Sequence, residues 1–434
     1  MLVTSLSLIA LLALFLVCGV WIGLALVSAG LLTAFLFTSI PLNVLLPQYI
    51  FNVFTTPDLI ALPLYILMGE ILFRTKLAAA LFSGLAPWAS LLPGRLLHVN
   101  VIGCSMFAAV AGSSVATIQV VGKITSTELL KRGYQPSIAT GSLAGAGTLG
   151  FLIPPSTVMI IYGVLANTSI IRLFTAGVIP GLLLAIAFMG WIMIHSKINP
   201  GLVPDDNDEL KNMPFREKLK ATKDLLPAFF LIVCVLGTMY LGLATPSEAA
   251  AIGVVGALIV AWLQKGITRK ALREIAVGTI CTSSMMGLII LGATLLGGIN
   301  AFLGVPTYFA ELIGGLNLSA FELILLLTVL YLVLGLFLEG FSIIVTTLPV
   351  FLPIVVAAGF DPIWFGIYLV IVVEMAQITP PLGFNFFAIQ SMTGYSIKFL
   401  AKATLPYLII MIMFVLLVTI FPEIVMWLPN KMFG

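Results

Sequence analysis

Two pairs of adjacent prolines interrupt long apolar segments of the chain, in GTLGFLIPPSTVMIIYG and EMAQITPPLGFNFFAIQ. The pairs are Pro154–Pro155 and Pro380–Pro381. A double proline removes two backbone donors and breaks a helix, so the carbonyls of the preceding turn lose their partners. Unwound carbonyls of this kind coordinate small cations inside transport proteins. The two segments therefore predict broken helices that could hold Na⁺.

A cluster of glycine and polar residues precedes each proline pair at nearly the same distance. The first cluster is AVAGSSVAT, beginning at residue 109, and the second is FLEGFSIIVTT, beginning at residue 337. Ser113 stands 41 residues before the first pair, and Gly340 stands 40 residues before the second. The two windows share little residue identity, so the matched order and spacing are the evidence for a duplication.

Each cluster is expected to form the tip of a re-entrant helical hairpin, over 96–126 and 321–357. Glycine and serine disfavour a helix interior and supply spare hydrogen-bonding groups. Irregular backbone is tolerated at membrane depth only where it is buried in protein or lines a wet cavity. Proline kinks and glycine packing points are the alternative explanation of either break alone.

The tips and breaks supply the candidate binding residues. One predicted Na⁺ site combines the first tip with the first break: Ala111, Gly112, Gly150, Ile153 and Pro155. Its counterpart in the second half combines Glu339, Gly340, Ala376, Thr379 and Pro381. The expected substrate contacts are polar side chains beside the breaks: Ser113, Ser114, Ser156 and Asn385.

Four acidic residues fall within apolar sequence, at Glu70, Glu311, Glu339 and Glu374. Burying a charge in a bilayer costs several kcal/mol, so such acids are functional candidates. We expect a functional role only for Glu339, at a tip, because Glu70 and Glu374 fall near helix ends and Glu311 near a loop. The four cysteines and two histidines form no metal-binding or redox pattern, so no cofactor is expected.

Composition identifies the solvent in which these elements must fold. The 434 residues are 61% hydrophobic and only 9% charged, which is too few charges to cover a water-soluble surface. In lipid every backbone group must be paired inside the protein, and the long unbroken apolar runs favour helices over a barrel. The net charge of +3 gives no reason to expect a nucleic-acid partner. The chain is therefore predicted to be an all-α integral membrane protein.

Ten membrane crossings are expected from the apolar runs. The N-terminal run is interpreted as two retained helices with a turn near Gly19, because no basic residue precedes it. Basic segments 213–226 and 267–277 are expected to lie on the membrane surface, and Thr245 with Glu248 forms a capping box. The expected crossings are 2–19, 21–38, 58–73, 136–165, 173–195, 225–243, 247–263, 278–298, 361–393 and 403–428.

The distribution of Lys and Arg predicts the orientation of these crossings. With both termini outside, all basic residues except Arg172 and Lys431 fall on the cytoplasmic side, as the positive-inside rule requires. The two hairpins then enter from opposite sides, so the halves form an inverted repeat. The expected divisions are 1–73 (scaffold), 96–165 (first hairpin and broken helix), 173–298 (scaffold and arms, with a cytoplasmic loop 197–224), 321–393 (second hairpin and broken helix) and 403–434 (C-terminal helix).

The segments AVAGSSVAT, GTLGFLIPPSTVMIIYG, LATPSEAAAIG and MAQITPPLGFN resemble the large membrane subunit, the M or DctM-like component, of tripartite ATP-independent periplasmic (TRAP) transporters. The resemblance extends over nearly the whole chain, with the motifs in the family's order. The family more often has Ser before the tip glycine, whereas here Ala111 offers only its carbonyl.

The resemblance implies a Na⁺-driven secondary importer of small organic acids in the bacterial inner membrane, with both termini in the periplasm. It implies an elevator movement of a transport domain against a scaffold. It also implies two partners besides the lipid bilayer, a small four-helix membrane subunit called Q, expected as a separate chain, and a soluble periplasmic binding protein. Relatives carry C4-dicarboxylates, sialic acids and other sugar acids.

Three other classes of membrane protein remain as alternatives. A stand-alone dicarboxylate-type Na⁺ symporter would share the hairpins and broken helices but work without a binding protein. A channel would need a continuous polar pore, and the sequence has no repeated ring of charges to build one. An intramembrane enzyme would need a nucleophile with its base or a metal cluster. The chain has no GxxxxGK[ST] motif, so its energy must come from an ion gradient or another subunit.

Overall fold

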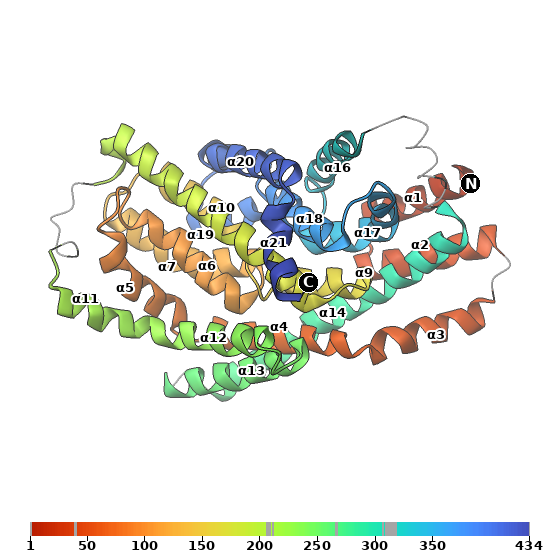
Figure 1. Cartoon of the computed structure of the whole chain (residues 1–434), viewed down its shortest axis with the longest axis horizontal. Helices are drawn as coiled ribbons and strands as arrows, with labels where there is room; N and C mark the ends of the chain where they lie inside the picture. Colours follow the sequence, from red (N-terminus) through yellow and green to blue (C-terminus); the bar gives the residue numbers. More distant parts are fainter. Residues whose placement is uncertain are drawn as a thin grey trace.

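The chain folds into helices throughout the part that can be described. The computed structural model describes residues 2–38, 41–204, 210, 212–264, 268–305, 308 and 319–433, and these contain helices and connecting turns but no strand. Figure 1 shows the helices in one elongated body, with the N-terminus at one end and the C-terminus near the middle. The all-α fold class expected from the sequence is confirmed.

The first half contains ten helices in the described ranges. The short turn η1 (Pro57–Ile60) joins α3 to α4. The ten are α1 (Leu2–Val17), α2 (Ile22–Phe37), α3 (Leu42–Thr55), α4 (Ala61–Phe73), α5 (Leu77–Ala89), α6 (Leu97–Ala111), α7 (Ser114–Lys131), α8 (Pro136–Gly147), α9 (Thr157–Ala166) and α10 (Ile170–Ile198).

The second half follows the connecting helix α11 (Phe215–Thr222). Its described helices are α12 (Leu226–Tyr240), α13 (Pro246–Leu263), α14 (Arg269–Phe302), α16 (Ala320–Leu334), α17 (Gly340–Ala357), α18 (Pro362–Gln377), α19 (Phe384–Thr393), α20 (Ile397–Ile420) and α21 (Glu423–Phe433). The pairs α6–α7 and α16–α17 are the expected hairpins, and α8–α9 and α18–α19 are the expected broken helices.

The two halves contact each other through corresponding pairs of helices. Helix α2 packs on α14, and correspondingly α13 packs on α4. Helix α7 is the second arm of the first hairpin and packs on α19. Its counterpart in the second hairpin, α17, packs in the same way on α9. Helix α20 contacts α8, and α10 contacts α18. Each contact thus recurs with the halves swapped, which is the pattern of a two-fold repeat. The proline pairs lie 226 positions apart in this register.

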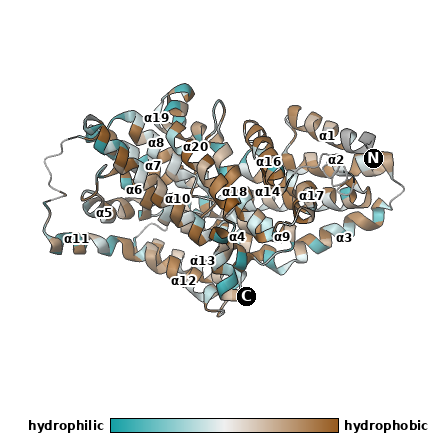
Figure 2. Ribbon diagram, turned by 45° about the horizontal axis from the view of Figure 1, so that its top comes forward, coloured by the Kyte–Doolittle hydropathy of each residue, from teal (hydrophilic) through white to brown (hydrophobic). Residues whose placement is uncertain are grey.

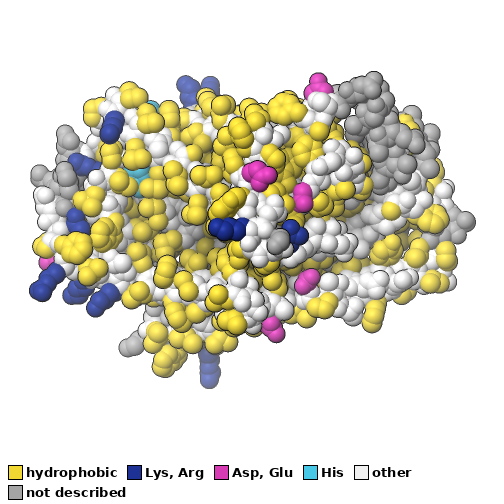
Figure 3. Space-filling model, viewed as in Figure 1, with side chains coloured by type: hydrophobic (Ala, Val, Ile, Leu, Met, Phe, Trp, Pro, Cys, Tyr) yellow, Lys and Arg dark blue, Asp and Glu magenta, His cyan; other side chains and the backbone are white. Residues whose placement is uncertain are grey.

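The outside of the molecule is apolar. Val17, Trp21 and Leu243 are between 74% and 86% exposed, and hydrophobic segments lie in every part of the fold (Figure 2). Hydrophobic side chains cover much of the face in Figure 3, and basic side chains gather on it toward the end of the molecule where α11 lies. An exposed apolar surface of this extent is matched to lipid.

Five of the described helices are long and apolar enough to cross a membrane: α10, α13, α14, α17 and α20. A sixth span is possible across α3 and α4, which bend by 58° at their junction. Other expected crossings are shorter, as in α1 and α2 with 16 residues each, or broken, so length and composition alone do not reach ten.

The structure corrects four expected boundaries. Helices α3 and α5 lie outside the expected crossings, and each contains an internal proline, Pro47 and Pro87 respectively. The arm 267–277 is not separate, since residues from Arg269 continue into the 34-residue helix α14. At 1.5 Å per residue, α14 is ~50 Å long and exceeds the ~30 Å hydrocarbon core. The expected helix 403–428 divides into α20 and α21 next to Pro422.

Candidate functional site

The first hairpin tip is a two-residue turn between α6 and α7. Gly112 has a φ of 60°, the left-handed region that favours glycine, and Ser113 is extended. A β-carbon on Gly112 would lie 3.0 Å from the Pro155 carbonyl oxygen and 3.1 Å from the Thr157 nitrogen. The hydroxyl of Thr157 donates a hydrogen bond to the Gly112 carbonyl at 2.7 Å. The tip is therefore seated directly on the first break.

The first break extends over residues 148–156, between α8 and α9. It contains a cis peptide bond between Pro154 and Pro155. Ser156 caps α9 by accepting a hydrogen bond from the Met159 nitrogen at 3.4 Å. Gly150 packs on the start of α7 so closely that a β-carbon would lie 2.6 Å from the Ser114 nitrogen. Glycine is required there because two backbones touch.

The structure brings most of the first predicted cation site together. Gly112, Gly150 and Pro155 meet at the tip and the break, and Ala111 precedes Gly112 at the buried end of α6. Ile153 departs from this group because its side chain packs toward Gly181 on α10. The backbone carbonyl of Ile153 remains part of the break.

The second hairpin tip is longer than the first. It extends over 335–339, between α16 and α17, and Glu339 precedes α17 without a side-chain capping bond. Gly335 is in close contact with Ala376 on α18. A β-carbon on Gly340 would lie 2.9 Å from the Phe151 ring and 3.0 Å from Val373. The second tip therefore contacts α18 of its own half and the break of the other half.

The second break extends over 378–383, between α18 and α19. A cis peptide bond joins Pro380 to Pro381, whose side chain is exposed. The hydroxyl of Thr379 donates to the Met375 carbonyl at 2.8 Å, one turn earlier in the same chain segment. In the second predicted cation site, Ala376 contacts Gly335 of the tip. The Thr379 hydroxyl instead bonds within its own segment.

Glu374 joins the two halves, although sequence reasoning gave it no role. Its Oε1 accepts hydrogen bonds from the Ser114 hydroxyl and, at 2.9 Å, from the Phe151 nitrogen. The side chain is fully buried in α18, where every residue from Ile363 to Gln377 is buried. In the sequence, the feature that could have drawn attention to Glu374 is its position directly after the apolar run from Ile363 to Val373.

The other predicted acids lie in different surroundings. Glu70 pairs with Arg74 at 3.5 Å, and Arg74 also pairs with Glu274 on α14 at 3.5 Å, so this group ties α4 to α14. Glu339 is half-buried at the second tip. Glu311 lies outside the described residues.

The four predicted substrate contacts are buried or half-buried beside the breaks. Ser114 and Ser156 are buried on either side of the contact between the first tip and the first break, and Ser113 is half-buried in the tip. Asn385 is fully buried near the start of α19, and its amide has no hydrogen-bond partner among the residues described. Helix α19 packs on α7, so Asn385 belongs to the element that adjoins the first hairpin.

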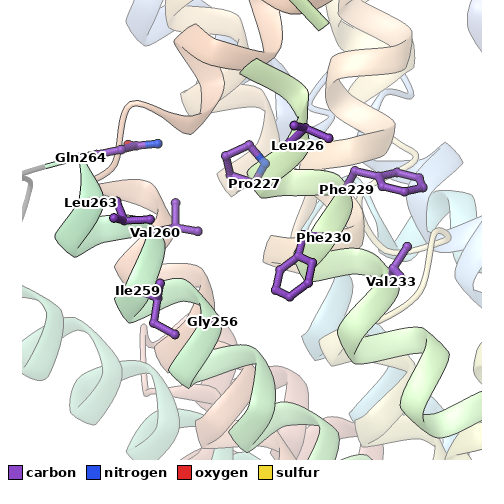
Figure 4. Close-up of a pocket in the computed structure, with 10 residues that line it drawn as sticks. All are labelled: Leu226, Pro227, Phe229, Phe230, Val233, Gly256, Ile259, Val260, Leu263 and Gln264. Atoms are coloured by element: carbon purple, nitrogen blue, oxygen red, sulfur yellow. The ribbon is translucent and has the colours of Figure 1, made fainter. Parts of the chain in front are cut away.

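An apolar groove of about 540 Å³ lies elsewhere, between α12 and α13 (Figure 4). Phe229, Phe230 and Ile259 are among the residues that line it, and Gln264 at one end is its one polar side chain. Such walls offer a carboxylate almost nothing to bind. The chemistry that suits an anion and a cation is at the tips and breaks.

An all-helical chain with an apolar exterior, two hairpins and two broken helices in a swapped repeat is a multi-pass membrane transporter. This chain belongs to the family of the DctM component of tripartite ATP-independent periplasmic transporters, whose family model matches residues 9–424. The resemblance noted in its motifs is thereby confirmed.

Two relatives illustrate the family. The chain is 33% identical over 376 residues to the C4-dicarboxylate TRAP transporter large permease protein DctM of Pseudomonas aeruginosa, covering 86% of each chain. It is 28% identical over 419 residues to the sialic acid TRAP transporter large permease protein SiaM of Vibrio cholerae, covering 96% of each.

A solved structure extends the comparison to the fold. The crystal structure of the Alcanivorax borkumensis YdaH transporter matches with a TM-score of 0.67 and 16% identity, over 97% of this chain and 98% of that one. At this identity the likeness concerns the fold alone.

Proposed function

We propose that the chain is the large membrane subunit of a Na⁺-driven importer of a small organic acid, such as a C4-dicarboxylate, a sialic acid or a similar carboxylate. The observation that carries the proposal is the seating of the first hairpin tip on the first break, where Gly112 and Pro155 meet. The relatives named above, a C4-dicarboxylate and a sialic acid permease, support a carboxylate as the cargo.

In this proposal the two kinds of backbone at the tips and breaks have different tasks. The unwound carbonyls before Pro155 and Pro381 are oxygen ligands for Na⁺. Four half-helices, α7, α9, α17 and α19, begin at the tips and breaks, and their N-termini carry partial positive charge that attracts a carboxylate. A cation site and an anion site thus lie side by side. One charge crossing ~100 mV supplies ~2.3 kcal/mol for uptake.

The moving part in this proposal is the unit made of α6–α9 and α16–α19, which travels as an elevator against the scaffold of α1–α4 and α12–α14. The scaffold is held by the pairs α2 with α14 and α4 with α13. Binding of the cation and the anion at the tips would fix the hairpins in the conformation that crosses the membrane.

The proposed setting is the inner membrane of a bacterium, with both termini in the periplasm. The proposed partners are a small membrane subunit and a soluble periplasmic binding protein that delivers the organic acid. The apolar exterior supplies the surface for lipid and for the small subunit.

A liposome assay tests the proposal. The chain is reconstituted with the small subunit, and uptake of a C4-dicarboxylate and of sialic acid is measured with the matching binding protein. We expect uptake that requires both the binding protein and an inward Na⁺ gradient. Equal uptake without the binding protein would instead favour the stand-alone symporter, which shares the hairpins and broken helices. Equal uptake with K⁺ in place of Na⁺ would contradict Na⁺ coupling.

A further inference from the structure

We propose that Glu374 is a positioning residue of the first cation site, and that it acts from the opposite half of the molecule. This inference rests on the proposed function, because it concerns the Na⁺ site at the first tip. Its starting point is that one carboxylate oxygen holds two groups of the first half at once, the Ser114 hydroxyl and the Phe151 nitrogen.

The two donors are the parts whose separation must be fixed for a cation to bind. Ser114 is the first residue of α7, directly after the tip, and Phe151 follows Gly150 in the first break. Gly150 and Ser114 already touch through their backbones. The side chain of Glu374 therefore connects the tip, the break and α18, and it holds the carbonyls of the break at a constant distance from the tip.

The burial of Glu374 gives this link its strength. The side chain has no exposed surface, and its second oxygen, Oε2, has no hydrogen-bond partner among the described residues. Loss of the acceptor would leave the Ser114 hydroxyl and the Phe151 nitrogen unpaired in a dry environment, which costs more than an exposed hydrogen bond is worth.

Among the described residues, this hydrogen-bonded link has no counterpart at the equivalent position of the first half. In the repeat register set by the proline pairs, the counterpart of Glu374 is Thr148. The hydroxyl of Thr148 donates to the Gly145 carbonyl of its own helix at 2.7 Å. The first tip and break are thus held by a hydrogen-bonding side chain of the second half, whereas Thr148 makes its described hydrogen bond within the first half. The two proposed sites should therefore differ in rigidity.

The test uses Na⁺ as the probe and needs no organic acid. The full-length chain in detergent is melted over a NaCl series in which choline chloride keeps the ionic strength constant. A site that binds Na⁺ only in the folded state raises the melting temperature as Na⁺ is added, and the series gives a midpoint concentration. The melting temperature in choline chloride alone reports the structural cost of each variant.

We expect Glu374→Ala to raise the Na⁺ midpoint by about tenfold, since two buried donors lose their acceptor. Glu374→Gln keeps an acceptor oxygen in the place of Oε1 and should stay within about threefold of wild type. Ser114→Ala should shift the midpoint in the same direction as Glu374→Ala, and the double variant should add little to the larger single effect. If Glu374→Ala does not fold, the Gln and Ser114 variants still decide the question.

The matched control is Tyr368→Phe, in the same helix but away from the first tip. The Tyr368 hydroxyl donates to the Ile324 carbonyl at 3.0 Å, so its loss should lower the melting temperature without moving the Na⁺ midpoint. An unshifted midpoint in Glu374→Ala, or a Gln variant as impaired as Ala, would overturn the positioning role. A wild-type chain that Na⁺ does not stabilise would overturn the proposed Na⁺ site itself, before any variant is compared.

Discussion

The two tip-and-break regions share a plan but differ in how firmly they are held. The first tip has two residues, and the Thr157 hydroxyl ties the Gly112 carbonyl to the break. The second tip has five residues, and Thr379 bonds to the preceding turn of its own segment. A repeated sequence plan thus produces one tip that is bonded to the neighbouring helix start and one longer tip without such a described bond.

The difference shows where a repeat becomes asymmetric. Both breaks contain a proline pair with a cis peptide bond, and both tips contain glycine in close contact with another element. The side chains that cross between elements differ, because Glu374 reaches the first half while its counterpart Thr148 stays local. The two halves therefore share a backbone plan, and they differ in the side-chain hydrogen bonds that connect the tips and breaks to other elements.

The largest effect is expected where two backbones touch in the tighter region. Gly150→Val places a branched side chain against the Ser114 backbone, which must move the tip away from the break. Overpacking of this kind costs about 1–3 kcal/mol of stability, and a displacement of ~1 Å at a binding site can reduce rate by about a hundredfold. The rate of uptake into liposomes measures this reduction.

Gly190→Val provides the comparison for this variant, since nothing lies within 4 Å of a β-carbon there. Its uptake should stay close to wild type. Normal uptake by Gly150→Val would mean that the first tip and break are not held as closely as their contact implies.

The next effect compares the two predicted cation sites directly. Ser113→Phe and Thr379→Phe each place a ring at a tip or break, and each should raise the Na⁺ concentration for half-maximal uptake by about tenfold or more, equivalent to ~1.4 kcal/mol. We expect the larger shift for Ser113, because it lies in a two-residue tip that is bonded to Thr157, whereas the Thr379 hydroxyl bonds only within its own segment. Unchanged Na⁺ dependence in either variant would remove that residue's site from the proposal.

The sequence was sufficient for features governed by local rules. The helices break at the predicted proline pairs, the hairpins turn at Gly112 and before Gly340, and the capping box of Thr245 with Glu248 is present. These features depend on residues close together in the chain. The turn at Gly19 between α1 and α2 belongs to the same class, with a φ of 75°.

Features set by tertiary packing could not be predicted in the same way. The prolines inside α3 and α5 do not end those helices, of which α3 packs on α14 and α5 packs on α6. The importance of Glu374 depends on contact with residues more than 220 positions away. Local sequence placed Glu374 near a helix end, and only the arrangement of the halves identified its partners.

A smaller effect isolates one hydrogen bond between the first tip and its break. Thr157→Val keeps the shape of the side chain and removes the hydroxyl that donates to the Gly112 carbonyl. A hydrogen bond of this type contributes about 0.5–1.5 kcal/mol, so the Na⁺ midpoint should rise by about two- to tenfold. The measurement is the NaCl melting series on the full-length chain.

Thr404→Val is the matched control, because the buried Thr404 hydroxyl donates to the Leu400 carbonyl of its own helix, α20. It removes the same group from a local bond and should leave the Na⁺ midpoint unchanged. Equal shifts in the two variants would show that the bond between tip and break has no special part in cation binding.

The smallest effect is expected in the scaffold, where charge pairs hold α4 to α14. Glu274→Gln removes one of the two ion-pair partners of Arg74. The Glu274 side chain is 45% exposed, and exposed ion pairs contribute at most about 1 kcal/mol to stability. The melting temperature should fall slightly at low salt and approach wild type at high salt, where screening weakens the pair. The Na⁺ midpoint, measured at constant ionic strength, should not move, because the pair lies on scaffold helices and not at a tip. A shifted midpoint would mean that the scaffold pair and the proposed first site are coupled.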